Sequence, residues 1–336
     1  MDTLTHIVLG ACAGEALIGK KAGKKALWIG ALANSIPDAD AITAVWLDEA
    51  DYLLAHRGFS HSILFALAAS FLLAYFCRRR FSLDGISYQR WLVFFMIEIG
   101  LHLFLDSLNA YGTGLFEPFT HARISFNTIF VADPFFSLGL GIAFLALLFL
   151  RSADPSRRYW MLAGVGLSCF YLLYCMFNKA KTETIALGAL REQRISYDQY
   201  FTTPTPFNNW LWYIVAGDEK GWHMGYYSVL AGKSKIDFHY FPRNDTLLQP
   251  IRQEEEVQDL LRFSQGFYTV SKKGDSLVFN DLRFGQMAGW HDPDAGFVFH
   301  YYPQRPGSNK LALQRGRFNH WNRETIRSML RRIRGD

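Results

Sequence analysis

The sequence predicts a mainly α-helical polytopic membrane domain, with about four to six membrane segments, followed by a soluble α+β domain. The chain of 336 residues is 50% hydrophobic, yet its mean hydropathy is only +0.02, because an apolar first half is averaged with a polar second half. Long apolar runs lie before residue 178, and short β-rich runs lie after it. We therefore expect a membrane-embedded domain over residues 1–178 and an extracytoplasmic α+β domain over residues 179–336.

The apolar runs define the expected membrane segments. They are Leu4–Gly19, Ala26–Leu47, Ser62–Cys77, Trp91–Leu108, Asp133–Leu150 and Trp160–Phe177. Several are shorter than the ~20 residues that a spanning helix needs, and the first two carry polar groups, so we expect tilted, broken or re-entrant segments. The start does not resemble a signal peptide, because Asp2 replaces the usual positive charge and His6 interrupts the apolar run.

The loop charges predict an orientation. Lysine and arginine are concentrated in the loops after the first, third and fifth segments, whereas the opposite loops contain only Arg57 and Arg123. Loops rich in these residues stay in the cytoplasm, so we expect both termini and the polar ends of the segments to face the exterior. The net charge of +5 comes largely from these loops and the C-terminal tail, which indicates membrane topology and no nucleic-acid partner.

The second half has the pattern of a sheet-containing domain. Short runs rich in β-branched and aromatic residues alternate with turn residues; they are Trp210–Val215, Ile236–Phe241, Ser276–Phe279 and Phe297–Tyr301. The chain ends in a basic amphipathic helix that either lies on anionic lipid or packs on its own domain, and packing is slightly favoured. The four cysteines lack zinc-finger spacing, so neither a disulfide framework nor a thiolate metal site is indicated.

His102 and Asp106 carry the strongest functional signal. They lie one helical turn apart inside an apolar run, and Glu98 precedes His102 by another turn, so all three share one helix face. An ionisable group at the bilayer centre costs roughly 2.5–3.5 kcal/mol, which favours a metal, a buried polar cluster or a water-filled cavity. A simple buried His–Asp hydrogen bond would give the same spacing.

Three further segments of the sequence could supply metal ligands. The whole candidate set is His6, Asp38, Asp40, His56, His61, His102 and Asp106. Imidazole and carboxylate together suit zinc, manganese or iron(II), with zinc expected first. Because seven ligands exceed the needs of one ion, we expect one or two divalent ions, two being about 3.5–4 Å apart.

Most of these residues also have a structural interpretation that needs no metal. A lone His6 is more often a packing residue, and Asp38 and Asp40 after Pro37 could cap a turn. Glu98 is expected to support a ligand by hydrogen bonding. His121 and Asp133 are weaker candidates, since an Asp-Pro pair is already a good helix start, and the role of Glu15 stays open.

Taken together, these pieces resemble a known family. The motifs are Thr5-His6, Pro-Asp38-x-Asp40, His56-Arg-Gly-x-Ser-His61-Ser, His102-x-x-x-Asp106, Tyr111-Gly112, Pro118-Phe119 and Asp133-Pro134. They are similar to the bacterial membrane-bound metal-dependent hydrolases, the YdjM-like group also described as LexA-binding inner-membrane-associated hydrolases. The resemblance covers roughly residues 1–180, with Ser60 where threonine is expected, and implies a multi-pass inner-membrane hydrolase. A weaker similarity to the helical zinc-dependent phospholipase C and nuclease group implies phosphodiester chemistry.

The leading hypothesis is a metal-dependent hydrolase, most simply a phosphoesterase, that acts on a lipid-linked or envelope-derived small substrate at the outer face of the membrane. Metal-activated water would be the nucleophile. Asp40 or Asp106 could act as general base, and Arg57 could hold a phosphoryl or carboxylate oxygen or anchor the chain at the bilayer interface. The alternatives are a transporter or metal channel, and a structural or regulatory membrane protein with a structural metal site.

Overall fold

The computed structural model describes residues 1–80, 85–232, 235–303 and 321–335. The chain forms two compact units. The first combines Met1–Thr43 with Ala55–Cys175, and the second combines Ala44–Leu54 with the residues from Met176 onward. The division therefore falls inside a long helix close to residue 178, and a short segment of the N-terminal half belongs to the second unit.

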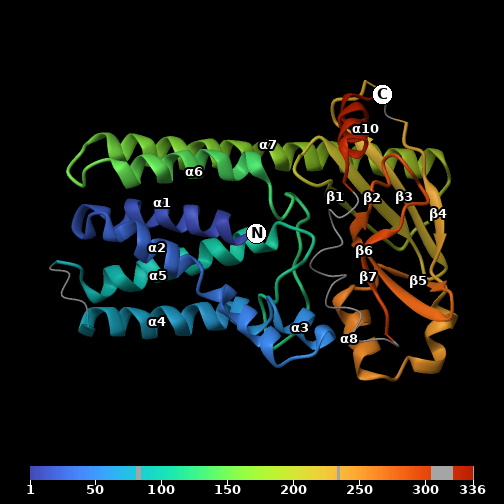
Figure 1. Cartoon of the computed structure of the whole chain (residues 1–336), viewed down its shortest axis with the longest axis horizontal. Coiled ribbons are helices and arrows are strands. Elements are labelled where there is room, and N and C mark those ends of the chain that lie inside the picture. Colours follow the sequence, from blue (N-terminus) through green and yellow to red (C-terminus); the bar gives the residue numbers. More distant parts are fainter. Residues whose placement is uncertain (81–84, 233–234, 304–320, 336) are drawn as a thin grey trace. The chain divides into compact units, whose positions relative to one another are not determined.

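The first unit is a bundle of helices that run side by side (Figure 1). Its elements are α1 (Thr3–Ala22), α2 (Lys25–Asn34), η1 (Pro37–Val45), η2 (Phe59–His61), α4 (Ile63–Arg80), α5 (Tyr88–Ser107), α6 (Pro134–Phe149) and the first part of α7 (Ser156–Glu192). The chain caps several of these helices itself, because Asp2, Ser87 and Asp133 accept backbone N–H bonds at the starts of α1, α5 and α6.

Glycines allow α1 and α2 to touch backbone to backbone. A Cβ atom at Gly14 would lie 2.3 Å from the carbonyl oxygen of Ala26, and one at Gly30 would lie 2.1 Å from that of Gly10. Only residues without a side chain permit such an approach. The contact fixes the position of His6 on α1 relative to the end of α2.

A buried ion pair joins α1 to the start of α7. The guanidinium of Arg157 donates to both carboxylate oxygens of Glu15, at 2.8 and 2.6 Å, and also to the carbonyl oxygens of Leu147 and Leu150. The bidentate geometry satisfies both charges inside the bundle. Glu15 thus has a structural partner that the sequence did not reveal.

The expected membrane domain with about four to six spans is wrong. Within the described ranges, α7 is one helix long and apolar enough to cross a membrane, and the pair Glu49–His61 and Ile63–Arg80, bent by 56°, would be a second if it is one span. The run Ala26–Leu47 divides into α2 and η1, since Pro37 disfavours helical backbone before it. The helix α6 has 16 residues, about 24 Å of rise against a core of ~30 Å.

The second unit contains two antiparallel sheets. The first has the order β1 (Gln199–Pro204), β2 (Leu211–Gly217), β3 (Gly221–Ser228) and β4 (His239–Pro242); the second has β5 (Tyr268–Lys273), β6 (Ser276–Gln286) and β7 (Phe297–Tyr301). Residues 218–220 connect β2 to β3, and residues 274–275 connect β5 to β6.

Helices complete this unit. They are α3 (Glu49–Ala55), η3 (Asp245–Ile251), α8 (Glu255–Phe263) and α10 (Arg323–Arg334). The basic helix α10 packs on its own unit, because Met329 and Ile333 are buried in the same apolar core as Tyr213 and Met224. Its packing face is therefore occupied, while Ile326 and Leu330 stay exposed.

Replacing Gly14 by alanine should destabilise the first unit. The added methyl group meets the backbone of α2, and overpacking of this kind costs about 1–3 kcal/mol. Thermal unfolding in detergent, followed by circular dichroism, measures the loss. Gly141→Ala on α6 is the matched control, since a Cβ atom there meets nothing within 4 Å. Equal melting temperatures for the two variants would contradict the tight α1–α2 contact.

Candidate metal centre

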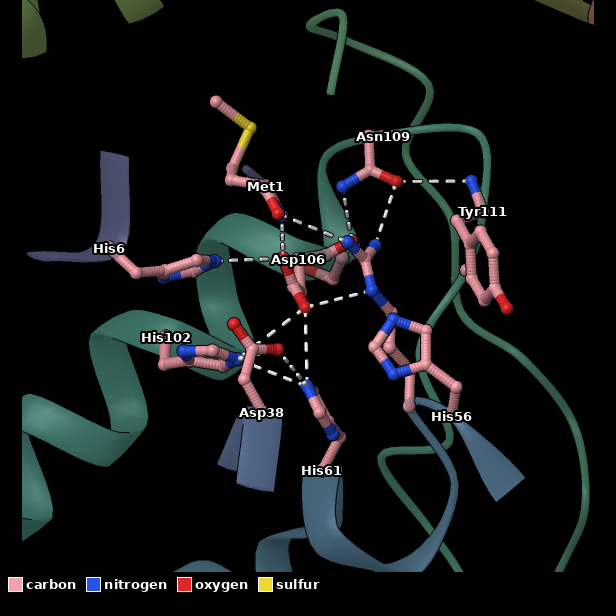
Figure 2. A network of polar contacts seen from close by, with 12 residues as sticks. Met1, His6, Asp38, His56, His61, His102, Asp106, Asn109 and Tyr111 are labelled. Carbon is pink, nitrogen blue, oxygen red and sulfur yellow. Dashed lines mark hydrogen bonds and ion pairs between the residues drawn. The ribbon is translucent and has the colours of Figure 1, made fainter. Parts of the chain in front are cut away.

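Four of the predicted ligands meet at one point in the first unit (Figure 2). Asp38 comes from η1, His61 from η2, and His102 and Asp106 from one face of α5. One ligand atom from each lies within 4.8 Å of all the others, so the group could hold a metal ion. The side chains of His61, His102 and Asp106 are fully buried, and that of Asp38 is 18% exposed. Among these four side chains, Asp38 is the one in contact with solvent in the described structure.

The spacing of the ligand atoms fits one divalent ion. Nε2 of His61 and Nε2 of His102 are 3.0 Å apart, and each lies 3.5 Å from Oδ1 of Asp38. Oδ2 of Asp106 lies 3.3 Å from the first of these nitrogens and 3.5 Å from the second. With bonds of about 2.0–2.2 Å, the ligands of a tetrahedral ion are roughly 3.3–3.6 Å apart. Two imidazoles and two carboxylates therefore form a plausible zinc site.

Hydrogen bonds fix which nitrogen of each imidazole faces this point. Nδ1 of His102 lies 2.6 Å from the carbonyl oxygen of Asn34, which can only accept, so Nδ1 carries the proton. Nδ1 of His61 lies next to Ser60 Oγ and Asp40 Oδ2. The Ser60 hydroxyl already donates to Asp40, so Nδ1 of His61 is also the donor.

Both Nε2 atoms are consequently bare in the neutral imidazoles. They face each other and two carboxylates, and Oδ2 of Asp106 accepts no hydrogen bond from the described residues. Four electron-pair donors around one buried point repel one another unless a cation or a proton lies between them. The arrangement is the one that metal-binding histidines adopt, with the second ring nitrogen donating to a carbonyl or carboxylate.

Asn34 is the residue that sequence reasoning missed. Its side-chain N–H groups donate to the backbone carbonyl and to Oε2 of Glu98, at 2.7 and 3.2 Å. This orients its Oδ1 towards Nδ1 of His6, 3.2 Å away, so one asparagine accepts from both His6 and His102. An asparagine at a helix end is an ordinary capping residue, so no local signal distinguishes it.

Glu98 lies behind Asn34 and not among the four ligands. It is fully buried, and this burial raises the pKa of its carboxyl group well above the ordinary value, against the hydrogen bond from Asn34. A carboxyl group kept neutral in this way is a poor cation ligand. The geometry agrees with a supporting position for Glu98.

Asp40 and His56 are not among the four candidate ligands, but Asp40 contacts the ligand His61. Asp40 accepts from His56 Nδ1 at 2.9 Å, from the backbone N–H of Arg57 at 3.0 Å and from Ser60 at 2.7 Å. Burial raises the pKa of Asp40, but hydrogen bonds from His56 and His61 outweigh it and hold the value well below the ordinary range. Asp40 thus organises the loop that carries His61.

The carboxyl group of Asp38 is also held ionised. Burial raises its pKa, whereas the hydrogen bonds that His102 and His61 donate when their Nε2 atoms carry a proton lower it, and the net value lies well below the ordinary one. A carboxylate that stays ionised at neutral pH is ready to bind a cation.

His6 contacts Oδ1 of Asp106, whereas Arg57 contacts Oδ2, the oxygen that also faces His61 and His102 (Figure 2). His6 stacks on His102 with ring centroids 3.8 Å apart, and its Nε2 lies 3.2 Å from Oδ1 of Asp106. Nε of Arg57 lies 3.0 Å from Oδ2 of Asp106, and its NH1 donates to Asn109. The amino group of Met1 also contacts Asp106. Asp106 is the residue on which all these groups converge.

Two weaker candidates lie outside this cluster. His121 is exposed and pairs with Glu117 at 2.8 Å. Asp133 caps α6 and accepts from the hydroxyl of Tyr171 at 2.9 Å. Both have structural partners, and the cap at Asp133 is the one that its Asp-Pro sequence indicated.

Comparison with known proteins agrees with the resemblance drawn from the motifs. The family model described as YdjM inner membrane protein matches residues 1–182. A relative named "Uncharacterized protein YfhP" from Bacillus subtilis (strain 168) is 33% identical over 143 residues, 40% of this chain and 42% of that protein. "Inner membrane protein YbcI" from Escherichia coli (strain K12) is 30% identical over 112 residues, 33% of this chain and 63% of that protein.

The chain thus spans less than two thirds of the length of either relative. No solved structure matches the chain. The matched part contains the metal centre, whereas the two sheets follow it in the sequence.

Replacing Asn34 by leucine should weaken metal binding by roughly tenfold, the lower end of the effect of removing a group that supports the ligands. Leucine keeps the volume and the backbone carbonyl that accepts from His102, but it loses the side-chain bonds to His6 and Glu98 that hold the end of α2 against α5. Zinc affinity, measured by competition with a chelator, gives the change. The matched control is Ser35→Ala, which loses only a hydrogen bond within α2. Wild-type affinity in the folded leucine variant would show that the side chain of Asn34 does not support the ligands.

Proposed function

Because the chain belongs to the YdjM inner membrane protein family, we propose that it is a membrane-associated, metal-dependent hydrolase whose centre is the group Asp38, His61, His102 and Asp106. The proposed reaction is hydrolysis of a phosphoric ester in a lipid-linked or envelope-derived substrate. The single observation that carries the proposal is the pair of bare imidazole nitrogens, 3.0 Å apart, enclosed by two carboxylates.

The ligand set suits zinc, with manganese or iron as alternatives, because it contains imidazole and carboxylate and no thiolate. A bound ion of this kind supplies hydroxide at neutral pH by lowering the pKa of water to about 7. A transporter or a purely structural metal site would bind metal equally well without turnover.

The residues around the centre have separate proposed roles. Arg57 is buried and lies over the ring of Tyr111, 4.8 Å from its centroid, so its guanidinium is held in place beside Asp106. A guanidinium binds a phosphoryl group through two parallel hydrogen bonds, and Arg57 would orient the substrate in this way. Asp40 would act indirectly, since its oxygens already bind His56, Ser60 and the backbone of Arg57.

Asp106→Asn should abolish hydrolysis and leave the protein folded. Asparagine keeps the shape but removes the negative charge that binds a cation, so activity should fall by roughly 100-fold or more. A screen of phosphomonoesters, phosphodiesters and phospholipids identifies the substrate, and zinc content is measured in parallel. The control is Asp154→Asn, where asparagine can still accept from the backbone N–H of Ser156.

Glu98→Gln provides a graded comparison in the same assay. Because Glu98 contacts Asn34 and not the four ligands, the loss of activity should be about tenfold or less. Wild-type metal content and turnover in Asp106→Asn would contradict the proposed centre.

If the bent pair Glu49–His61 and Ile63–Arg80 is one span and α7 is the other, Arg90, Arg151, Arg157 and Arg158 lie between the first span and the apolar part of α7. A segment rich in these residues stays in the cytoplasm, so we also propose that the C-terminal unit lies outside it. Alkaline phosphatase needs the oxidising periplasm to form its disulfides, so a fusion after Gly335 should be active. A matched β-galactosidase fusion should be inactive. The reverse pattern would place this unit in the cytoplasm.

A further inference from the structure

An apolar groove lies between α4 and α5 in the first unit. Its volume is about 400 Å³, and its lining includes Leu67, Gly100, Leu103, Phe104 and Phe126. The one hydroxyl group of the lining, on Ser107, already donates to the carbonyl oxygen of Phe104. The groove therefore offers hydrocarbon contacts and almost no hydrogen bonds.

The groove and the metal centre are built from the same segments. On α5, Leu103 follows the ligand His102 and Ser107 follows the ligand Asp106; on α4, Ile63 comes two residues after His61. The groove thus lies beside segments that carry three of the four candidate ligands. Beyond the groove, α4 carries further exposed apolar side chains, among them Phe71 and Leu72, so the apolar surface continues along the helix.

We propose that this groove binds the hydrocarbon chain of a lipid whose phosphate head group lies at the metal centre. The inference rests on the proposed function and narrows its substrate class to membrane lipids. An occupant with a peptide backbone is disfavoured, because its polar groups would lose their hydrogen bonds to water in a lining of this kind. Lipid chains are abundant around a member of an inner-membrane family.

The absence of a side chain at Gly100 makes the groove testable. A Cβ atom at this position meets nothing within 4 Å, so a leucine side chain can occupy the groove without displacing the helices. Gly141 on α6 is equally open and is not among the lining residues. Gly100→Leu and Gly141→Leu are therefore a matched pair.

The first measurement is binding without turnover. A long-chain phospholipid with a diazirine on its acyl chain is photolysed with the purified full chain, and the labelled peptides are identified by mass spectrometry. We expect labelling of α4 and α5 in the wild type and in Gly141→Leu, and at least a tenfold reduction in Gly100→Leu. Equal labelling of α4 and α5 in both variants would overturn the inference.

The second measurement is selectivity. Each methylene buried in the groove should tighten binding roughly fourfold, so the ratio of long-chain to water-soluble substrate turnover should fall at least tenfold in Gly100→Leu and stay constant in Gly141→Leu. An unchanged ratio in both variants would overturn the inference. If the wild type binds the lipid probe in the groove but hydrolyses no substrate, the proposed function fails and the groove assignment stands.

Discussion

The arrangement of the first unit depends on keeping four electron-pair donors together at one buried point. Nε2 of His61 lies 3.0–3.5 Å from Nε2 of His102 and from the carboxylates of Asp38 and Asp106, and such electron-pair donors repel one another unless a cation or a proton lies between them. Neighbouring residues hold these side chains in position. Asn34 holds His102 through its backbone carbonyl, and Asp40 holds His61 together with the loop that carries it.

Helix packing farther from the four candidate ligands also helps to hold them in place. The glycine contact between α1 and α2 brings the end of α2, and with it Asn34, against α5. Asn34 then connects His6, His102 and Glu98 in one network of hydrogen bonds. The side-chain oxygen and amide group of Asn34 both have partners in this network, and such contacts favour one arrangement of the residues that they join.

The expected membrane segments show that the apolar runs of a sequence do not by themselves identify membrane spans. Trp91–Leu108 is apolar enough to be read as a span, but in α5 the residues Trp91, Phe94 and Ile99 are buried against other helices. Hydropathy measures the preference of a side chain for a non-aqueous environment and does not distinguish lipid from protein. Length was the better guide, since α2 and α6 are too short. In the second half, alternation and turn residues located strands such as β7, because both signals are local.

The sequence by itself determined the chemistry of the centre and part of its geometry. His102 and Asp106 share a face because the helical repeat places residues four apart on one side, and the ligand types excluded a thiolate site. Only the tertiary structure decided that Asp38 and His61 join them, that Asp40 contacts His61 from outside the group, and that Asn34 orients two imidazoles. These contacts join segments far apart in the chain, and they are fixed by helix packing and side-chain hydrogen bonds, which no local periodicity records.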